Sequence, residues 1–134
     1  MIIRYCVASL FIIVALSEST LAQNIEDVVK ARKDIADIQS KLRLSNDRSK
    51  QGAKLLMGLV ELSDEFGRPF TLIQAAKRFV LSNPEHERHP EIMLRLIDAQ
   101  LVVGRDKDAI STARQFIDRH ANHVEVAMVH RLLA

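Results

Sequence analysis

The chain has 134 residues, with 19 Lys and Arg against 17 Asp and Glu, five His and a single Cys. Because the net charge of +2 is spread along the chain, the composition predicts no nucleic-acid partner and no strong attraction to an anionic membrane surface. One Cys cannot form a disulfide framework, so apolar burial must hold the fold together.

Residues 1–22 have the layout of a secretory signal peptide. One charge, Arg4, precedes the apolar run CVASLFIIVAL, and the polar stretch SESTLA follows and ends at Ala22. We expect cleavage before Gln23 and therefore an exported protein, either periplasmic or secreted. An uncleaved anchor is the alternative, but this apolar run is far shorter than the roughly 20 residues that span a bilayer. We therefore expect no stable membrane insertion after the signal peptide is removed.

Residues 23–51 predict one amphipathic helix and a polar hinge. The helix is expected from Asn24, as its N-cap, to about Leu44. Apolar residues recur along it at spacings of three and four, as in a heptad seam: Val28, Ala31, Ile35, Ile38 and Leu42. Because the seam lasts little more than two heptads, we expect the helix to lie on the rest of the domain, with self-association as the alternative. The segment SNDRSKQG predicts the hinge.

Residues 52–134 contain an internal repeat. The segments GRPFTLIQAAKRFVLSN and GRDKDAISTARQFIDRH begin 37 residues apart and share five identical residues. A period of this length is typical of stacked helical repeats. The pattern predicts helix–turn–helix units at about 53–89 and 90–125 and a partial third unit at 126–134, hence an all-α fold.

Equivalent core positions follow from the repeat. On the first helix of each unit they are Leu56, Leu59, Val60 and Ser63, matched by Met93, Leu96, Ile97 and Gln100. On the second helix they are Leu72, Ile73, Ala76, Phe79 and Val80, matched by Ala109, Ile110, Ala113, Phe116 and Ile117. The last helix matches the third at an offset of 36, through Met128, Val129, Leu132 and Leu133. Gly58, inside a helix, predicts the close approach of a neighbouring helix.

The two units resemble tetratricopeptide repeats. The family's apolar, Gly and small-residue positions are matched in the first unit by Leu56, Leu59, Val60, Gly67, Leu72, Ala76, Phe79 and Pro84. In the second unit they are matched by Met93, Leu96, Ile97, Gly104, Ala109, Ala113 and Phe116. Leu56 and Met93 stand where the family favours Trp, Ser63 and Gln100 where it favours Tyr, and Ala121 where Pro is usual. Each unit is also about three residues longer than the family standard of about 34. The resemblance implies a short α-solenoid of antiparallel helix pairs.

The sequence offers no catalytic signature. The four Gly residues are scattered, the segment after residue 22 has no thiol, and no Ser lies in a GxSxG elbow. We therefore predict neither catalysis nor a cofactor. The five His residues are His86, His89, His120, His123 and His130. They are more readily interpreted as exposed turn residues than as a metal site, because no Cys supports them, and a His-based metal site remains the least favoured alternative.

By the same resemblance, first-helix residues outside the core line a concave groove. The candidate partner-binding residues are Met57, Glu61, Asp64, Leu94, Asp98 and Leu101. Such a mixture of apolar and acidic groups suits a peptide that carries Lys or Arg beside an apolar anchor. The leading prediction is a non-catalytic adaptor or scaffold that binds a protein or peptide. The alternative is a structural homo-oligomer built through the seam helix and the C-terminal helix.

Overall fold

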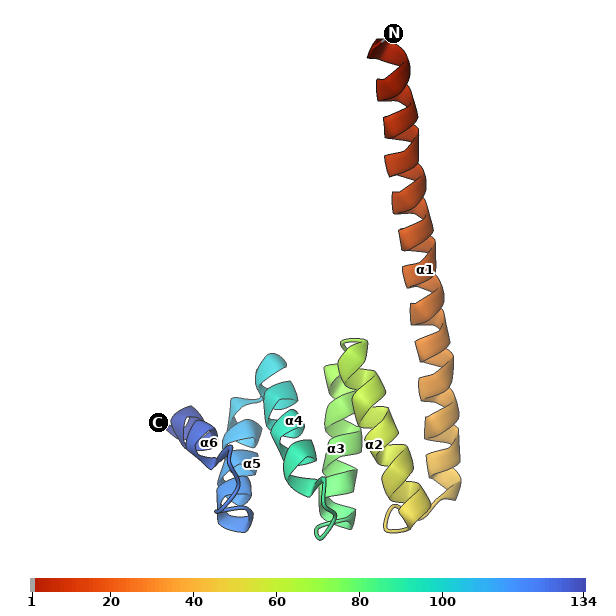
Figure 1. Ribbon diagram of the computed structural model, residues 1–134. Helices are drawn as coiled ribbons and strands as arrows, with labels where there is room; N and C mark the ends of the chain where they lie inside the picture. The colour runs from red at the N-terminus through yellow and green to blue at the C-terminus, as the bar shows by residue number, and fades with distance from the viewer. Residues whose placement is uncertain (1) are drawn as a thin grey trace. The chain divides into compact units, whose positions relative to one another are not determined.

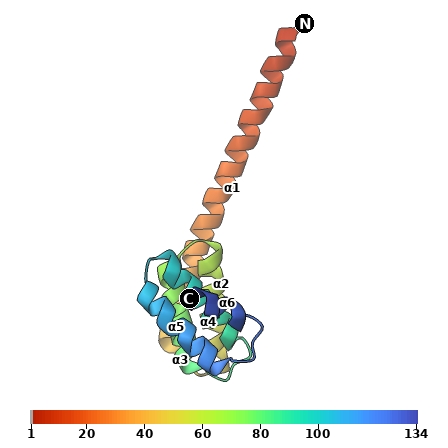
Figure 2. The same cartoon turned by 90° about the vertical axis from the view of Figure 1, so that its left-hand side faces the viewer.

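In the computed structural model, which describes the backbone of residues 2–134 and the side chains from Thr20 onward, every regular element is a helix. The helices are α1 (Ile2–Leu44), α2 (Lys50–Glu65), α3 (Pro69–Ser82), α4 (His89–Val102), α5 (Asp106–Arg119) and α6 (Val126–Leu133). The predicted all-α class is confirmed. From α2 to α6 each helix packs on the next in chain order, as a short solenoid (Figure 1). Figure 2 looks along this row from the α6 end.

Two compact units make up the chain, Met1–Asp34 and Ile35–Ala134. The first unit is the N-terminal part of α1, so the predicted helix start at Asn24 is wrong. Residues 1–51 contain no Gly or Pro that would interrupt a helix, and α1 runs from Ile2 through Asn24. Most of the predicted signal peptide lies outside the residues whose side chains are described. Over the described part of the chain, no helix is both long and apolar enough to cross a membrane.

The second unit begins with the last turns of α1. Ile35 and Leu42 of the predicted seam are buried in the first core cluster of this unit, and Ile38 packs against it. Val28, in the first unit, is exposed. The C-terminal part of the seam therefore belongs to the solenoid core, as expected for a helix that lies on its own domain.

The predicted hinge is shorter than its sequence suggests, because α2 already begins at Lys50. Ser49 caps this helix, since its Oγ accepts the Gly52 N–H at 2.9 Å. Gly52 is buried in the first turn, and a Cβ at this position would overlap the backbone carbonyl of Asn46. Asp47 then ties the α1–α2 loop to α3 through two hydrogen bonds from Arg78 of 2.6 and 2.9 Å. Close backbone approach, and not hinge flexibility, therefore explains a Gly at this position.

The backbone repeats at 37 residues in every turn. Gly67 and Gly104 both have positive φ, of 60° and 73°, and both of the preceding helices end with the hydrogen bonds of a Schellman motif. The longer loops are residues 83–88 and 120–125. After the first of them the Ile92 N–H donates to the Arg88 carbonyl, and after the second the Val129 N–H donates to the Glu125 carbonyl in the same way. The last helix is thus related to α4 by 37 residues, and the offset of 36 predicted from side-chain type alone is wrong.

Two apolar clusters form the core of the second unit. The first joins α1, α2, α3 and α4 and contains Phe79, while the second joins α4, α5 and α6 and contains Phe116. Both Phe side chains are fully buried. All eight predicted first-helix core residues are buried, as are Leu72, Ile73, Ala76, Ala109 and Ala113. The repeat therefore identifies most of the core correctly.

Four positions depart from the predicted packing. Ile110 is exposed although its equivalent Ile73 is buried in the first core cluster. Met128 and Leu132 are exposed as well, because the true register gives them the positions of Glu91 and Arg95. A Cβ placed on Gly58 would meet no atom within 4 Å, so the predicted close approach of a neighbouring helix there is wrong.

Candidate partner-binding face

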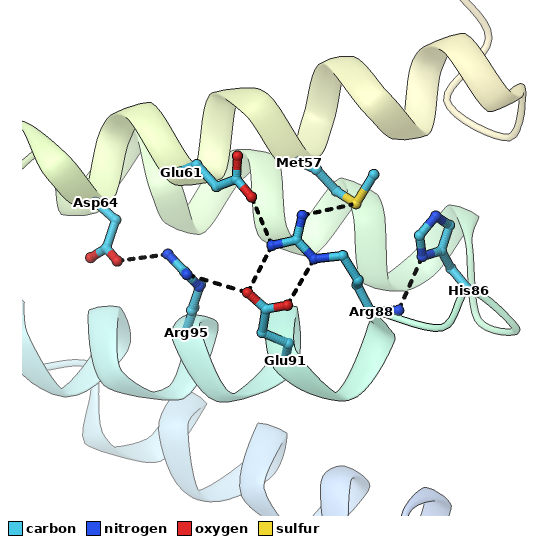
Figure 3. A network of polar contacts seen from close by, with 7 residues as sticks. All are labelled: Met57, Glu61, Asp64, His86, Arg88, Glu91 and Arg95. Atoms are coloured by element: carbon cyan, nitrogen blue, oxygen red, sulfur yellow. Dashed lines mark hydrogen bonds and ion pairs between the residues drawn. The ribbon is translucent and has the colours of Figure 1, made fainter.

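The side of the solenoid formed by α2 and α4 carries a charged network, defined here as the α2–α4 face. Its five ionic residues are Glu61, Asp64, Arg88, Glu91 and Arg95. Across the two helices Arg88 contacts Glu61 at 2.7 Å, and Arg95 contacts Asp64 at 2.8 Å. Glu91 joins both pairs, at 2.8 Å from Arg88 and 3.2 Å from Arg95 (Figure 3). Each of these five charges therefore has a partner of opposite sign.

Electrostatics within the network favour the charged forms. Hydrogen bonds from Arg88 lower the pKa of Glu91 below its ordinary value, and those to Glu91 and Glu61 raise the pKa of Arg88. Met57 lies beside the network, with its Sδ 3.8 Å from an Arg88 nitrogen. Each acidic group of this face is thus ion-paired within the protein, so a ligand meets no unpaired carboxylate in the network.

The equivalent positions on α4 and α6, displaced by 37 residues, form the α4–α6 face. It consists of Leu94, Asp98, Leu101, Glu125, Met128 and Leu132. Arg88, Glu91 and Arg95 are replaced by Glu125, Met128 and Leu132. The apolar side chains of Leu101, Met128 and Leu132 are 39, 37 and 46% exposed. The cations of one face therefore give way to an acid and an apolar group on the next.

Asp98 is the residue of the α4–α6 face that corresponds to Glu61. Within the described part of the chain no hydrogen bond or ion pair reaches its carboxylate, whereas Glu61 meets Arg88. Burial, and then the nearby charge of Asp64, raise the pKa of Asp98 above its ordinary value of 3.8. A cation placed here would offset the repulsion from Asp64 and favour the charged form of Asp98.

The six groove residues predicted from the sequence separate into two groups. Met57, Glu61 and Asp64 belong to the ion-paired α2–α4 face, and Leu94, Asp98 and Leu101 belong to the α4–α6 face. Leu94 is only partly exposed, because it packs against the second core cluster.

The three ionic residues that α4 and its N-cap contribute to the first face are not predicted by the sequence pattern. They are Arg88, Glu91 and Arg95, and Arg88 and Arg95 pair with the acids of α2. They could be found by aligning the two units at an offset of 37 residues. In that alignment these three charged residues are replaced by Glu125, Met128 and Leu132.

The histidines have roles in the loops. His86 and His123 are equivalent, since each Nδ1 accepts a backbone N–H two residues on and each ring packs edge-on against a core Phe. His89 is fully buried, so the expectation of exposed turn histidines is wrong for it. Its Nδ1 lies 2.9 Å from His120 Nε2, and its Nε2 lies 3.2 Å from the Val80 carbonyl. These bonds tie the start of α4 to α3 and to the end of α5.

Burial lowers the pKa of both His89 and His120 below 6.5. Over the described residues, no group of three or more His, Cys, Asp or Glu side chains is arranged to hold a metal ion. Comparisons of the chain with protein-family models, with curated proteins and with solved structures give no match.

Proposed function

We propose that this protein is a non-catalytic binding module of an exported compartment, and that the α4–α6 face binds a protein segment with an apolar anchor beside a Lys or Arg. The observation that carries this proposal is the exchange between equivalent faces. Where the charges of α2 and α4 are paired across the first face, the equivalent positions of the next face carry exposed apolar side chains and Asp98. Apolar groups rimmed by charge are typical of protein-interaction surfaces.

The chemistry of the face defines the expected partner. Leu101, Met128 and Leu132 supply the apolar contact, and Met is a side chain that adapts to differently shaped partners. Asp98 and Glu125 supply negative charge, and no ion pair within the described residues engages the Asp98 carboxylate. An amphipathic segment that places a cation next to a large apolar residue would satisfy both requirements. The likeness to tetratricopeptide repeats supports the same kind of binding.

The test replaces apolar residues of the α4–α6 face with the charged residues found at the equivalent positions of the α2–α4 face. Peptides selected from a random-peptide library on the native protein should be rich in Lys or Arg next to Leu or Phe. Met128→Glu with Leu132→Arg should weaken their binding at least tenfold, since burial of two apolar anchors is worth about 1.5–3 kcal/mol each. Titration of a labelled selected peptide measures the affinity.

A matched control uses an apolar residue elsewhere. Leu81 is exposed on α3, outside the α4–α6 face, so Leu81→Glu should leave peptide binding unchanged. Equal affinity of the selected peptides for the native protein and for the Met128→Glu, Leu132→Arg variant would refute the proposed face.

A structural homo-oligomer is a second candidate, favoured by an apolar stripe in the first unit. Ile25 and Val28 are exposed along α1 at a spacing of three, in continuation of the predicted seam. Sedimentation velocity at several concentrations tests this candidate. Self-association that Val28→Glu abolishes, together with no peptide selected on the α4–α6 face, would favour the oligomer over the adaptor.

A further inference from the structure

A cavity of about 370 Å³ lies where the C-terminal ends of α2 and α4 meet the start of α3. Its apolar wall includes Leu72, Ala99 and Val102, and its polar groups include Ser63, Asp64 and Asp98. Asp98 also belongs to the α4–α6 face, so the cavity adjoins the surface proposed to bind a protein segment.

Ser63 contributes a buried hydroxyl to this cavity. The residue is fully buried, and its Oγ makes no hydrogen bond within the described residues. At the equivalent position of the next unit, Gln100 accepts a hydrogen bond of 3.0 Å from Thr112 Oγ1. The shorter Ser63 therefore leaves both space and an unmet hydrogen bond, and a buried polar group without a partner is unfavourable.

The charges around the cavity are also incompletely paired. Of the four charged residues that line it, Asp64 and Arg95 bond to each other at 2.8 Å. The charge that acts on Asp98 is the like charge of Asp64. Arg68 lines the cavity from the turn after Gly67, yet within the described residues no ion pair joins it to Asp98. The side of the cavity next to Asp98 therefore favours a cation.

We propose that this cavity takes the side chain of a Lys from the bound protein segment, with the ammonium donating hydrogen bonds to the Asp98 carboxylate and Ser63 Oγ. The inference rests on the proposed function, because the Lys belongs to the segment on the α4–α6 face. The four methylenes of the Lys stem lie along Leu72, Ala99 and Val102, which suits a side chain that buries its stem and pairs its charged end.

Lys fits this cavity better than Arg. An ammonium is a compact charge with three donors that rotate to meet acceptors in different directions, such as a hydroxyl on one side and a carboxylate on the other. A guanidinium binds best to acceptors that lie in its own plane, and Asp64, the second carboxylate, is already engaged by Arg95. The site therefore recognises a primary alkylammonium.

The experiment uses Nα-acetyl-lysine methylamide as the probe, with the norleucine analogue, which lacks the ammonium, as its control. In NMR titrations of the full chain the lysine probe should shift the backbone amides of Ser63, Asp98 and Val102, and the norleucine probe should not. Asp98→Asn and Ser63→Ala should each weaken lysine binding about tenfold, since hydrogen bonds that involve a charged group are the stronger ones. Glu65→Gln, an exposed acid outside the cavity, should bind the probe normally.

The outcomes separate this inference from the proposed function. Ser63→Ala removes a hydroxyl that makes no hydrogen bond in the described part of the protein, so the variant should fold and its loss of probe binding reports on the cavity. Equal shifts from the norleucine probe, or unchanged lysine binding in Asp98→Asn, would overturn the Lys site. If the selected peptides still bound the α4–α6 face in that case, the proposed function would stand without it.

Discussion

The α2–α4 face and the α4–α6 face are built on one backbone and differ in what their side chains can do. Both lie on helices that are joined by equivalent turns. The backbone hydrogen bonds of these turns recur at an offset of 37 residues. On the first face Arg88 and Arg95 neutralise Glu61 and Asp64, and on the second the equivalents of these cations are Glu125 and Leu132. A repeated backbone therefore does not imply a repeated surface.

Under the proposed function, this difference would concentrate binding on one of the two faces. Ion pairs on the first face are internal to the protein and give a ligand few unpaired groups. The second face leaves apolar area and the Asp98 carboxylate for another molecule. Function in such a fold resides in particular side chains, while the fold supplies only their positions.

The largest expected effect tests whether the two regions share one kind of core. Phe79→Ala and Phe116→Ala should each lower the free energy of unfolding by about 3–5 kcal/mol, because each removes a fully buried ring from equivalent clusters. Urea denaturation measures both losses. A cost below about 1 kcal/mol for Phe116→Ala would mean that the α6 end lacks a true core, and the comparison of the two faces would lose its basis.

The cores of these units could be predicted from the sequence because burial constrains residue type at each position of a repeat. Phe79 and Phe116 illustrate this, since the same apolar residue recurs at the same distance from each Gly turn. The turn at Gly67 could also be predicted, because its positive φ strongly favours Gly.

The surface was harder to predict because several residue types satisfy an exposed helical position. Glu61 and Asp64 look like free acids in the sequence, and only the fold places Arg88 and Arg95 against them. The register of α6 is ambiguous in the sequence for a related reason. Met128 and Leu132 match core residue types, whereas the hydrogen bonds of the preceding loop fix their position one residue away. Backbone geometry decided where side-chain type was ambiguous.

The next prediction concerns a loss of stability in acid that depends on two histidines of the second repeat unit. At an offset of 37 residues, His89 and His120 occupy the positions that Gly52 and Asn83 hold one unit earlier. Burial lowers the pKa of both histidines, and the charge of Arg119 lowers them further while that of Glu85 opposes this. From about pH 6.5 down to the folded pKa values, the unfolded chain therefore binds more protons than the folded one. The free energy of unfolding should fall as the pH drops through 6.5 toward the folded pKa values.

Urea denaturation between about pH 7.5 and 5.5 measures this slope above the range where most carboxylates titrate. His120→Asn, which installs the residue of the first unit, should make the slope shallower because one of the two titrating groups is removed. His130→Asn is the matched control, since His130 is exposed on α6. An unchanged slope in His120→Asn would show that the histidine pair does not govern the acid response.

The smallest expected effect concerns the ion pairs that distinguish the faces. A double-mutant cycle with Asp64→Ala and Arg95→Ala should give a coupling of about 0.2–1 kcal/mol, because the two side chains are 56 and 32% exposed and water screens them. The same cycle at Leu101 and Leu132, the equivalent positions, should show no dependence on salt concentration, whereas the first coupling should weaken in high salt. Such pairs add little to stability, so their main consequence is to occupy Asp64. A coupling well above 1 kcal/mol would instead make the α2–α4 network a structural device, and the lack of its cations on the α4–α6 face would then be a loss of stability that binding must offset.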